Sequence, residues 1–236
     1  MALGDRAATW FDGEWHDGDA AIIRAADHGA WLGTMVFDGA RTFEGVTPDL
    51  DLHCERLIRS AHAMGLTPPV DGEAVAGIIR DGLKRFPPDM ALYLRPMMWS
   101  RSGSPAMIDP EPDSTAFAVC IEEYPMRAPA PFTLTMSPFR RPRPDMAVTE
   151  AKAACLYANN GRILAEARAR GFSNALSLDV EGNVAETASM NVFMVRDGVV
   201  LTPVANGHFL AGITRARIME LLRADGYDVR EASLSV

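Results

Sequence analysis

The sequence is poor in the features that mark secreted, membrane and nucleic-acid-binding proteins. Its 236 residues include three cysteines and no Cys-X-X-Cys pair, which argues against a disulfide framework or a thiolate metal site and favours a reducing, cytoplasmic location. We expect no membrane partner, because the N-terminus has no apolar signal core and no long charge-free segment is present. The net charge of -8, without a basic run, argues against a nucleic-acid partner.

Common catalytic motifs are also missing. The five histidines show no His-Glu-X-X-His spacing, and the chain contains neither Gly-X-Ser-X-Gly nor a phosphate-binding Gly-X-X-X-X-Gly-Lys loop. We therefore expect no metal-assisted hydrolysis, serine hydrolysis or P-loop chemistry, and no metal ligands. What remains is a chain that is 48% apolar, enough for a substantial core.

Lysine is nearly absent, and this makes one lysine conspicuous. The only two are Lys84, in an ordinary helix tail, and Lys152, among small and apolar residues in TEAKAACLYANNG. A lysine in an apolar setting can lose its proton, because desolvation lowers the pKa of an amine, and a neutral amine is what imine formation requires. On residue type alone, the commoner alternative is a half-buried lysine whose head group reaches water.

The first half of the chain alternates turns, strands and helices. A strand over Val36–Phe43 would place Phe37, Gly39 and Arg41 on one face, and the glycine indicates either a bulge or a close approach to the backbone. We also expect a hairpin around Asp12-Gly13, strands over Ala20–Ala25, Ala91–Trp99 and Thr115–Ile121, and helices over Asp51–Met64 and Gly72–Phe86.

The strand over Ala91–Trp99 carries polar residues inside an apolar run. Tyr93 and Arg95 share one face, and an arginine there needs an anionic partner or a ligand. Pro96 lacks an N–H group, which suggests an edge strand or a bulge at that position.

A proline-rich segment, PMRAPAP, separates the two halves of the sequence. We place a small N-terminal domain at 1–124, a linker at 125–131 and a cofactor-binding domain at 132–236. For the second half we expect a strand over Thr133–Ser137, a helix over Leu156–Arg170, hairpins over Asn174–Glu186 and Asn191–Leu201, a helix over Ile213–Ala224, and a strand beginning at Asp228.

Three features of the second half suggest one cofactor. Lys152 could form an imine, and the first turn of the helix at Ile213 and Thr214 offers amides and a hydroxyl for a phosphate. Glu186 lies in a small, uncharged run and could pair with a pyridinium nitrogen. These are the requirements of pyridoxal 5'-phosphate, and Arg56 would add charge-assisted hydrogen bonds to its phosphate.

The motifs that carry these residues resemble those of the class IV, or fold-type IV, aminotransferases, and within them the branched-chain amino-acid aminotransferases. The segments run in the family's order over essentially the whole chain: WFDGEW, HGAWLGTMVFDGAR, ERL, YLRP, EAKAACLYANN, GNVAETASMNVF and LAGITR. The resemblance implies an α+β fold of two domains, a small α/β domain and a larger β-barrel-like domain with helices. It also implies a homodimer that acts on small amino and keto acids.

The resemblance also implies a role for each candidate residue. Lys152 is similar to the Schiff-base lysine and general acid/base, Tyr157 to the tyrosine that binds the ring oxygen, and Glu186 to the partner of the ring nitrogen. Arg56, Ile213 and Thr214 match the phosphate site. The positions that match the substrate pocket are Phe37, Gly39, Arg41, Tyr93 and Arg95.

Four departures from the family pattern leave the donor open. Asp38 replaces the usual glutamate, Leu32 a common pocket tyrosine, and Met107 a glycine in the loop at 105–110, while the usual C-terminal segment is expected to be lacking after Val236. We expect transfer from an L-branched-chain amino acid to 2-oxoglutarate. The alternatives are a D-amino-acid or R-amine transaminase, aminodeoxychorismate lyase, or a non-catalytic homologue.

Overall fold

The computed structural model of the chain describes residues 6–126 and 128–236, which form two compact units. The first unit comprises Met1–Ala128 with Ala151–Cys155, and the second comprises Pro129–Glu150 with Leu156–Val236. The division falls inside the expected linker, but the five residues around Lys152 belong to the first unit and not to the cofactor domain. We propose the two units as the domains; residues 1–5 and 127 lie outside the described residues.

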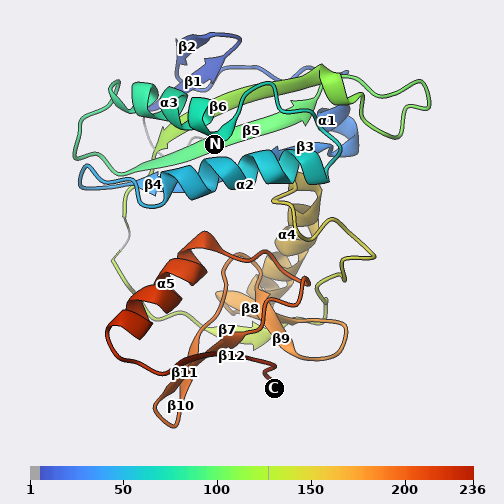
Figure 1. The fold of residues 1–236 in the computed structure, drawn as a ribbon. Coiled ribbons are helices and arrows are strands. Elements are labelled where there is room, and N and C mark those ends of the chain that lie inside the picture. Colours follow the sequence, from blue (N-terminus) through green and yellow to red (C-terminus); the bar gives the residue numbers. More distant parts are fainter. Residues whose placement is uncertain (1–5, 127) are drawn as a thin grey trace. The chain divides into compact units, whose positions relative to one another are not determined.

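A six-stranded sheet forms the frame of the first unit (Figure 1). The order of its strands is β2-β1-β6-β5-β3, and β4 also pairs with β5. All described pairings within it are antiparallel. Its strands are β1 (Ala7–Phe11), β2 (Glu14–Asp17), β3 (Met35–Phe37), β4 (Ala40–Thr42), β5 (Leu92–Ser100) and β6 (Thr115–Glu123).

The N-terminal hairpin follows from its turn residues, whereas the next expected strand is absent. Asp12 and Gly13 have φ angles of 49° and 94°, the left-handed conformations that a two-residue hairpin turn needs. The strand expected over Ala20–Ala25 is wrong: this segment is irregular and leads into the short helix α1 (His28–Leu32). Its backbone is instead held locally, for example by the side chain of Asp27, which accepts from the Arg24 amide at 3.1 Å.

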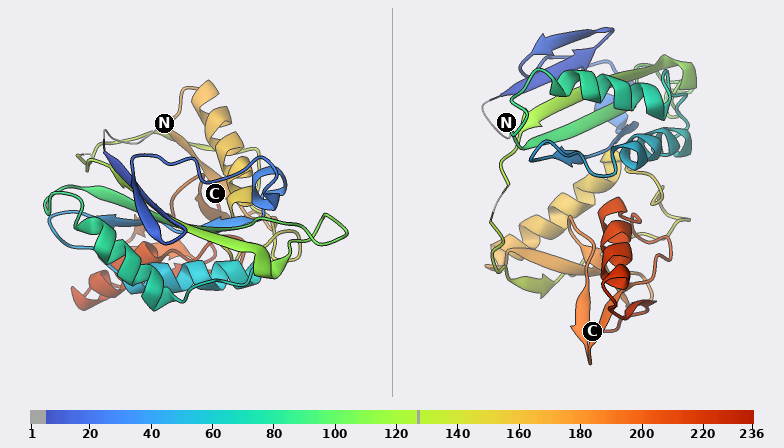
Figure 2. Two further views of the ribbon diagram at one scale, coloured as in Figure 1. Left: turned by 90° about the horizontal axis from the view of Figure 1, so that it is seen from above. Right: turned by 60° about the vertical axis from the view of Figure 1, so that its left-hand side comes forward.

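Two helices cover one face of this sheet (Figure 2). They are α2 (Leu50–Ala63) and α3 (Gly72–Leu83), and Asp71 caps α3 by accepting from the Ala74 amide at 2.8 Å. A Cβ atom at Gly82 of α3 would collide with the side chain of Ile121, which pairs with Leu94 across the sheet. The helices therefore lie on the Leu94 face, and Tyr93 and Arg95 lie on the opposite face.

The expected strand over Val36–Phe43 is two short strands with a break at Asp38 and Gly39. Both β3 and β4 pair with β5, and the Asp38 amide donates to the Pro96 carbonyl at 2.9 Å. The backbone of Pro96 thus faces the break between β3 and β4. Because neither strand is paired there, the missing N–H group of Pro96 removes little of the hydrogen bonding between strands. Pro96 therefore lies in a central strand, contrary to the edge position that its residue type suggested.

The second unit contains two three-stranded sheets and two helices, where the resemblance implied a barrel-like domain. The first sheet, β7-β8-β9, packs against α4 through Ile163, Ala167 and Ala175. The second, β10-β11-β12, packs against α5 through Met219, Val200 and Val229. The elements are β7 (Leu134–Met136), α4 (Ala154–Ala169), β8 (Asn174–Leu178), β9 (Val184–Thr187), β10 (Met194–Arg196), β11 (Val199–Pro203), α5 (Ile213–Ala224) and β12 (Val229–Ala232).

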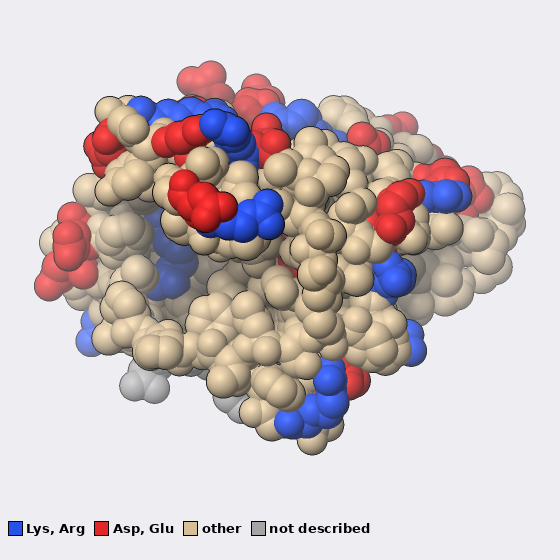
Figure 3. All heavy atoms as spheres, turned by 90° about the horizontal axis from the view of Figure 1, so that it is seen from below, with Lys and Arg blue, Asp and Glu red and all other residues tan. Residues whose placement is uncertain are grey.

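The surface carries charges of both signs. In the view of Figure 3, Lys and Arg side chains alternate with Asp and Glu side chains among uncharged residues, and no large patch of one sign is seen on the part of that face drawn in colour. Within residues 6–126 and 128–236, none of the helices combines the length and the apolar character needed to cross a membrane.

Candidate active site

Lys152 is fixed by its backbone to the strand and helix that carry other candidate residues. Its carbonyl accepts from the Phe37 amide at 3.2 Å, and its amide donates to the Ser60 hydroxyl of α2 at 3.0 Å. The side chain is half-buried, and its Nζ lies 5.0 Å from the centre of the Phe37 ring. Because the backbone of Lys152 is anchored on both sides and its amine lies over an aromatic ring, the direction in which the amine points is restricted.

The expected substrate residues of the first unit share one face of the sheet. Phe37 pairs with Met97, and Arg41 pairs with Tyr93, so these side chains and Arg95 lie on the face opposite α2 and α3. Arg41 donates to the carbonyls of Leu92 at 3.2 Å and Tyr124 at 2.5 Å, and it lies over the Tyr124 ring at 4.3 Å. Burial lowers the pKa of the Arg41 guanidinium, whereas the neighbouring Tyr124 and Tyr93 raise it.

Arg95 has an anionic partner within the chain. It lies 5.3 Å from the Tyr93 ring and donates to the buried Glu122 carboxylate at 2.6 Å. The anionic partner expected for this arginine is therefore, at least in part, Glu122 of β6. The sequence pattern did not reveal this pairing.

Gly39 lies where the Tyr93 hydroxyl approaches the backbone. A Cβ atom at position 39 would overlap the Tyr93 hydroxyl, and the next ring atom would lie only 2.9 Å away. Of the two explanations for this glycine, a bulge or a close approach to the backbone, the close approach is correct. The approaching residue is Tyr93, a candidate for the substrate pocket.

On the helix face of the sheet, Asp38 forms a fully buried ion pair with Arg56. Arg56 Nε and Nη2 donate to the two carboxylate oxygens at 2.7 and 2.8 Å, and His53 Nδ1 lies 2.7 Å from the same carboxylate. Burial alone would raise the pKa of Asp38, but hydrogen bonds and charge from Arg56 and His53 lower it to about 2. Since Asp38 takes the N–H of Nε and one N–H of Nη2, any phosphate contact by this arginine would use its remaining N–H groups, on Nη1 and Nη2.

In the second unit, Glu186 is held by polar side chains that the sequence analysis did not select. Arg141 Nη2 lies 3.1 Å from Glu186 Oε1, and the side-chain Nδ2 of Asn191 donates to Glu186 Oε2 at 3.1 Å. Arg141 also donates to Asn160 on α4, while its buried Nε has no hydrogen-bond partner among the described residues. An unsatisfied buried donor is costly, and such a cost is typical of functional sites.

Asn191 connects Glu186 to the start of α5. Its side-chain Nδ2 donates to the Leu210 carbonyl at 3.3 Å, and its side-chain oxygen fills the space where a Cβ atom at Gly212 would lie. The helix begins at Ile213, and its first backbone bond runs from the Ala216 amide to the Gly212 carbonyl at 3.0 Å. The backbone N–H groups of Ile213 and Thr214 come before the residue that donates this first bond. Such N–H groups at a helix N-terminus are the ones that can bind an anion.

The remaining residues of this region are Arg215 and Tyr157. Arg215 is buried and donates to the Pro203 carbonyl and the Glu231 carboxylate, each at 2.7 Å, which ties α5 to β11 and β12. Tyr157 lies in the first turn of α4. The structure thus groups Lys152, Arg56 and the five pocket residues in the first unit, and Glu186 with Ile213 and Thr214 in the second.

The supporting residues carry little sequence signal. Arg141 stands in a basic, proline-rich loop, and nothing in RRPRPD distinguishes a buried arginine from a solvated one. Asn160, Asn191 and Glu122 are common polar residues whose roles depend on their distant partners.

These residues fit pyridoxal phosphate. The first unit offers a lysine whose backbone is anchored, and the second offers a carboxylate held by an arginine and a helix N-terminus; these are the kinds of group that this cofactor uses. The class IV amino-transferase family model matches residues 35–236, and the chain belongs to this family of pyridoxal-phosphate-dependent aminotransferases.

Relatives and solved structures are similar to the chain over nearly its whole length. A probable branched-chain-amino-acid aminotransferase of Rickettsia bellii is 32% identical over 96% of this chain and 78% of its own. A Brucella abortus aminotransferase, solved with bound PLP, is 52% identical with a TM-score of 0.96, covering 98% of this chain and 82% of its own. The branched-chain aminotransferase of Thermoproteus uzoniensis, solved with norvaline, is 28% identical with a TM-score of 0.88, covering 98% and 79%.

Proposed function

We propose that this aminotransferase moves the amino group of an L-branched-chain amino acid to 2-oxoglutarate, with Lys152 as the residue that binds the cofactor aldehyde. The observation that carries this proposal is the position of Lys152 Nζ, 5.0 Å from the centre of the Phe37 ring on the sheet face that bears Arg41 and Tyr93. The names of the Rickettsia bellii and Thermoproteus uzoniensis relatives support the branched-chain donor. The acceptor is proposed because 2-oxoglutarate carries two carboxylates, and this face also offers two arginines, Arg41 and Arg95.

Each residue has a task in this proposal. When bound, pyridoxal phosphate supplies an electron sink for the pair left on the substrate α-carbon. Lys152 would bind the cofactor aldehyde, and its free amine would take the proton from the substrate α-carbon. Glu186, held by Arg141 and Asn191, would keep the ring nitrogen protonated. Tyr157 would bind the ring oxygen, and the phosphate contacts would come from Arg56, Ile213 and Thr214.

The substrate pocket would use the sheet face of the first unit. Phe37 would contact an aliphatic side chain, Gly39 gives the Tyr93 hydroxyl its space, and Arg41, Arg95 and Tyr93 would bind carboxylates. In the loop expected to affect specificity, Met107 has a φ of 63°, the left-handed conformation in which the related enzymes favour glycine. This chain adopts that conformation with a methionine side chain.

We further propose a cytoplasmic homodimer. The three cysteines carry free thiols, which suits a reducing compartment. The dimer rests on the resemblance to the family, and light scattering coupled to size-exclusion chromatography would give the mass in solution directly.

Spectra of half-reactions test the function. The wild-type protein with pyridoxal phosphate should show the absorbance of a lysine imine, and Lys152→Ala should abolish it. L-Leucine and L-isoleucine should bleach this absorbance, whereas D-alanine and an R-amine should not. A wild type without imine absorbance would contradict the role of Lys152. Bleaching by D-alanine but not by L-leucine would replace the branched-chain donor with a D-amino acid.

A further inference from the structure

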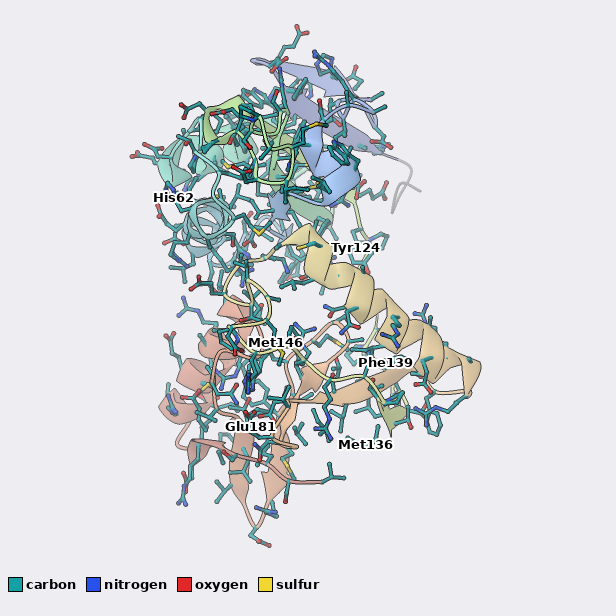
Figure 4. All side chains as sticks on the ribbon, turned by 90° about the vertical axis from the view of Figure 1, so that its right-hand side faces the viewer. His62, Tyr124, Met136, Phe139, Met146 and Glu181 are labelled. Atoms are coloured by element: carbon teal, nitrogen blue, oxygen red, sulfur yellow. The ribbon has the colours of Figure 1, made fainter. Side chains whose placement is uncertain are left out.

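Three potential metal-ligating side chains converge in the second unit, outside the residues assigned to the reaction. Asp179 follows β8, Glu181 lies in the turn before β9, and His208 lies in the segment between β11 and α5. One ligand atom of each lies within 4.8 Å of the other two. Glu181 is labelled in Figure 4 and is half exposed, so the cluster opens to solvent on one side.

The Nδ1 atom of the His208 imidazole faces the two carboxylates of this cluster. The residue is 94% buried, since its relative exposure is 6%. Its Nδ1 is buried and has no hydrogen-bond partner among the described residues. An imidazole nitrogen that is sealed from water and aimed at two carboxylates needs either a proton or a cation, because an unsatisfied buried polar atom is costly.

The distances from His208 to the two carboxylates fit a small cation. His208 Nδ1 lies 3.4 Å from Asp179 Oδ2 and 3.4 Å from Glu181 Oε2. Both distances are longer than a good hydrogen bond. Ligands bound tetrahedrally to zinc at about 2.0–2.1 Å are separated by roughly 3.3 Å from one another. The observed separations are therefore close to those of two edges of a zinc coordination tetrahedron.

A second layer of hydrogen bonds orients the Asp179 carboxylate. The Asn183 amide N–H donates to Oδ1 at 2.8 Å, and the Asn206 side chain donates to Oδ2 at 3.1 Å. Such outer partners are a regular feature of metal sites.

The charged groups around the cluster do not fill it. Arg140 donates to the backbone carbonyl of Asp179 at 2.6 Å, not to its carboxylate. Arg143 is near Glu181 but forms its ion pair with Asp145 at 2.8 Å. The two carboxylates and the imidazole thus remain the groups that converge on one point.

We propose that Asp179, Glu181 and His208 form a site for one divalent transition-metal ion, with Zn²⁺ as its typical occupant. One imidazole and two carboxylates favour zinc over magnesium or calcium, which prefer oxygen ligands alone. The metal would connect the β8–β9 turn to the segment that leads into α5 and would therefore stabilise the second unit. Sequence motifs could not show this site, because its ligands come from two separate segments.

Metal binding by the untagged holoenzyme tests this proposal. The protein, dialysed free of excess cofactor and of metal, is titrated with ZnCl₂, and bound zinc is measured after equilibrium dialysis. We expect a tight zinc site in the wild type, and a rise in Tm with zinc that a chelator reverses. Glu181→Gln should weaken that site at least about tenfold and remove the rise in Tm.

Two further samples complete the experiment. Glu220→Gln, an exposed change on α5, should bind zinc as the wild type does, and His208→Asn should lose the site. Because Glu181 is half exposed, its variant should fold even if the His208 variant does not. Equal zinc binding by the wild type and Glu181→Gln would overturn the proposal, as would equal affinity for Mg²⁺ and Zn²⁺. Either result would leave the aminotransferase assignment unaffected.

Discussion

Each unit of this protein buries an arginine–carboxylate pair, and the two pairs are completed differently. In the first unit, Arg56 donates two hydrogen bonds to Asp38, and His53 lies against the same carboxylate. In the second unit, Arg141 contacts Glu186 with one nitrogen and Asn160 with another, while its Nε lacks a hydrogen-bond partner among the described residues. Asp38 is fully buried, and Glu186 is 8% exposed.

This difference separates a carboxylate with a structural role, Asp38, from one that is a candidate for acting on a ligand, Glu186. A bidentate pair with an added histidine satisfies the carboxylate, so the Asp38 network anchors α2 to the break between β3 and β4. The Arg141–Glu186 pair leaves a buried donor unsatisfied, which reduces its value for stability and suits a group that acts on a ligand. Three experiments test this contrast, and a fourth tests the substrate face of the first unit.

The largest expected effect is on stability. Asp38→Asn should lower the free energy of unfolding by about 3–5 kcal/mol, because it leaves the Arg56 charge buried without its partner. Urea unfolding measures the loss, and Asp81→Asn, which removes an exposed carboxylate on α3, is the matched control. A loss no larger than that of the control would mean that the Asp38 network does not anchor α2.

The corresponding change in the second unit should act on the reaction. Glu186→Gln should lower kcat about 10²–10³-fold, because a preorganised charge opposite the ring nitrogen is removed. Its loss of stability should be smaller than that of Asp38→Asn, since Arg141 keeps its bond to Asn160. Steady-state kinetics and urea unfolding of both variants test this contrast. Unchanged kcat would remove Glu186 from the proposed mechanism.

The pH dependence of the unfolding free energy should show the contribution of the Asp38–Arg56 pair. The pKa of Asp38 is lowered from 3.8 to about 2, so its contribution is present above about pH 4 and is lost as the pH falls towards 2. This contribution is about 2 kcal/mol. The difference in unfolding free energy between the wild type and Asp38→Asn should shrink over that interval. A difference that is constant with pH would contradict the lowered pKa.

The smallest of the four effects concerns Gly39. Gly39→Ala should displace the Tyr93 ring and raise KM for the amino donor about tenfold, equivalent to about 1.4 kcal/mol of binding. Gly77→Ala is the control, because no atom lies within 4 Å of the added Cβ and the site is on an exposed helix surface. Equal KM values in the two variants would show that Tyr93 does not bind the donor.

Local patterns were sufficient to predict most of the secondary structure. The helix over Ile213–Ala224 has the expected bounds, and the hairpins at Asp12-Gly13 and Asp197-Gly198 form because both residues of each turn adopt positive φ. The exceptions are segments where side chains of distant residues decide. The break at Asp38 depends on Arg56, and the irregular course of 20–25 depends on bonds such as that from Asp27.

The alternating elements, the lone lysine in an apolar setting and the order of motifs typical of the family can all be seen in the sequence without a structure. These are local properties of composition, turn residues and periodicity. The ion-pair partners became visible only in the folded chain: Asp38 for Arg56, Glu122 for Arg95 and Arg141 for Glu186. Such partners are set by sheet register and by the packing of helices on strands, which bring together residues that are far apart in the chain.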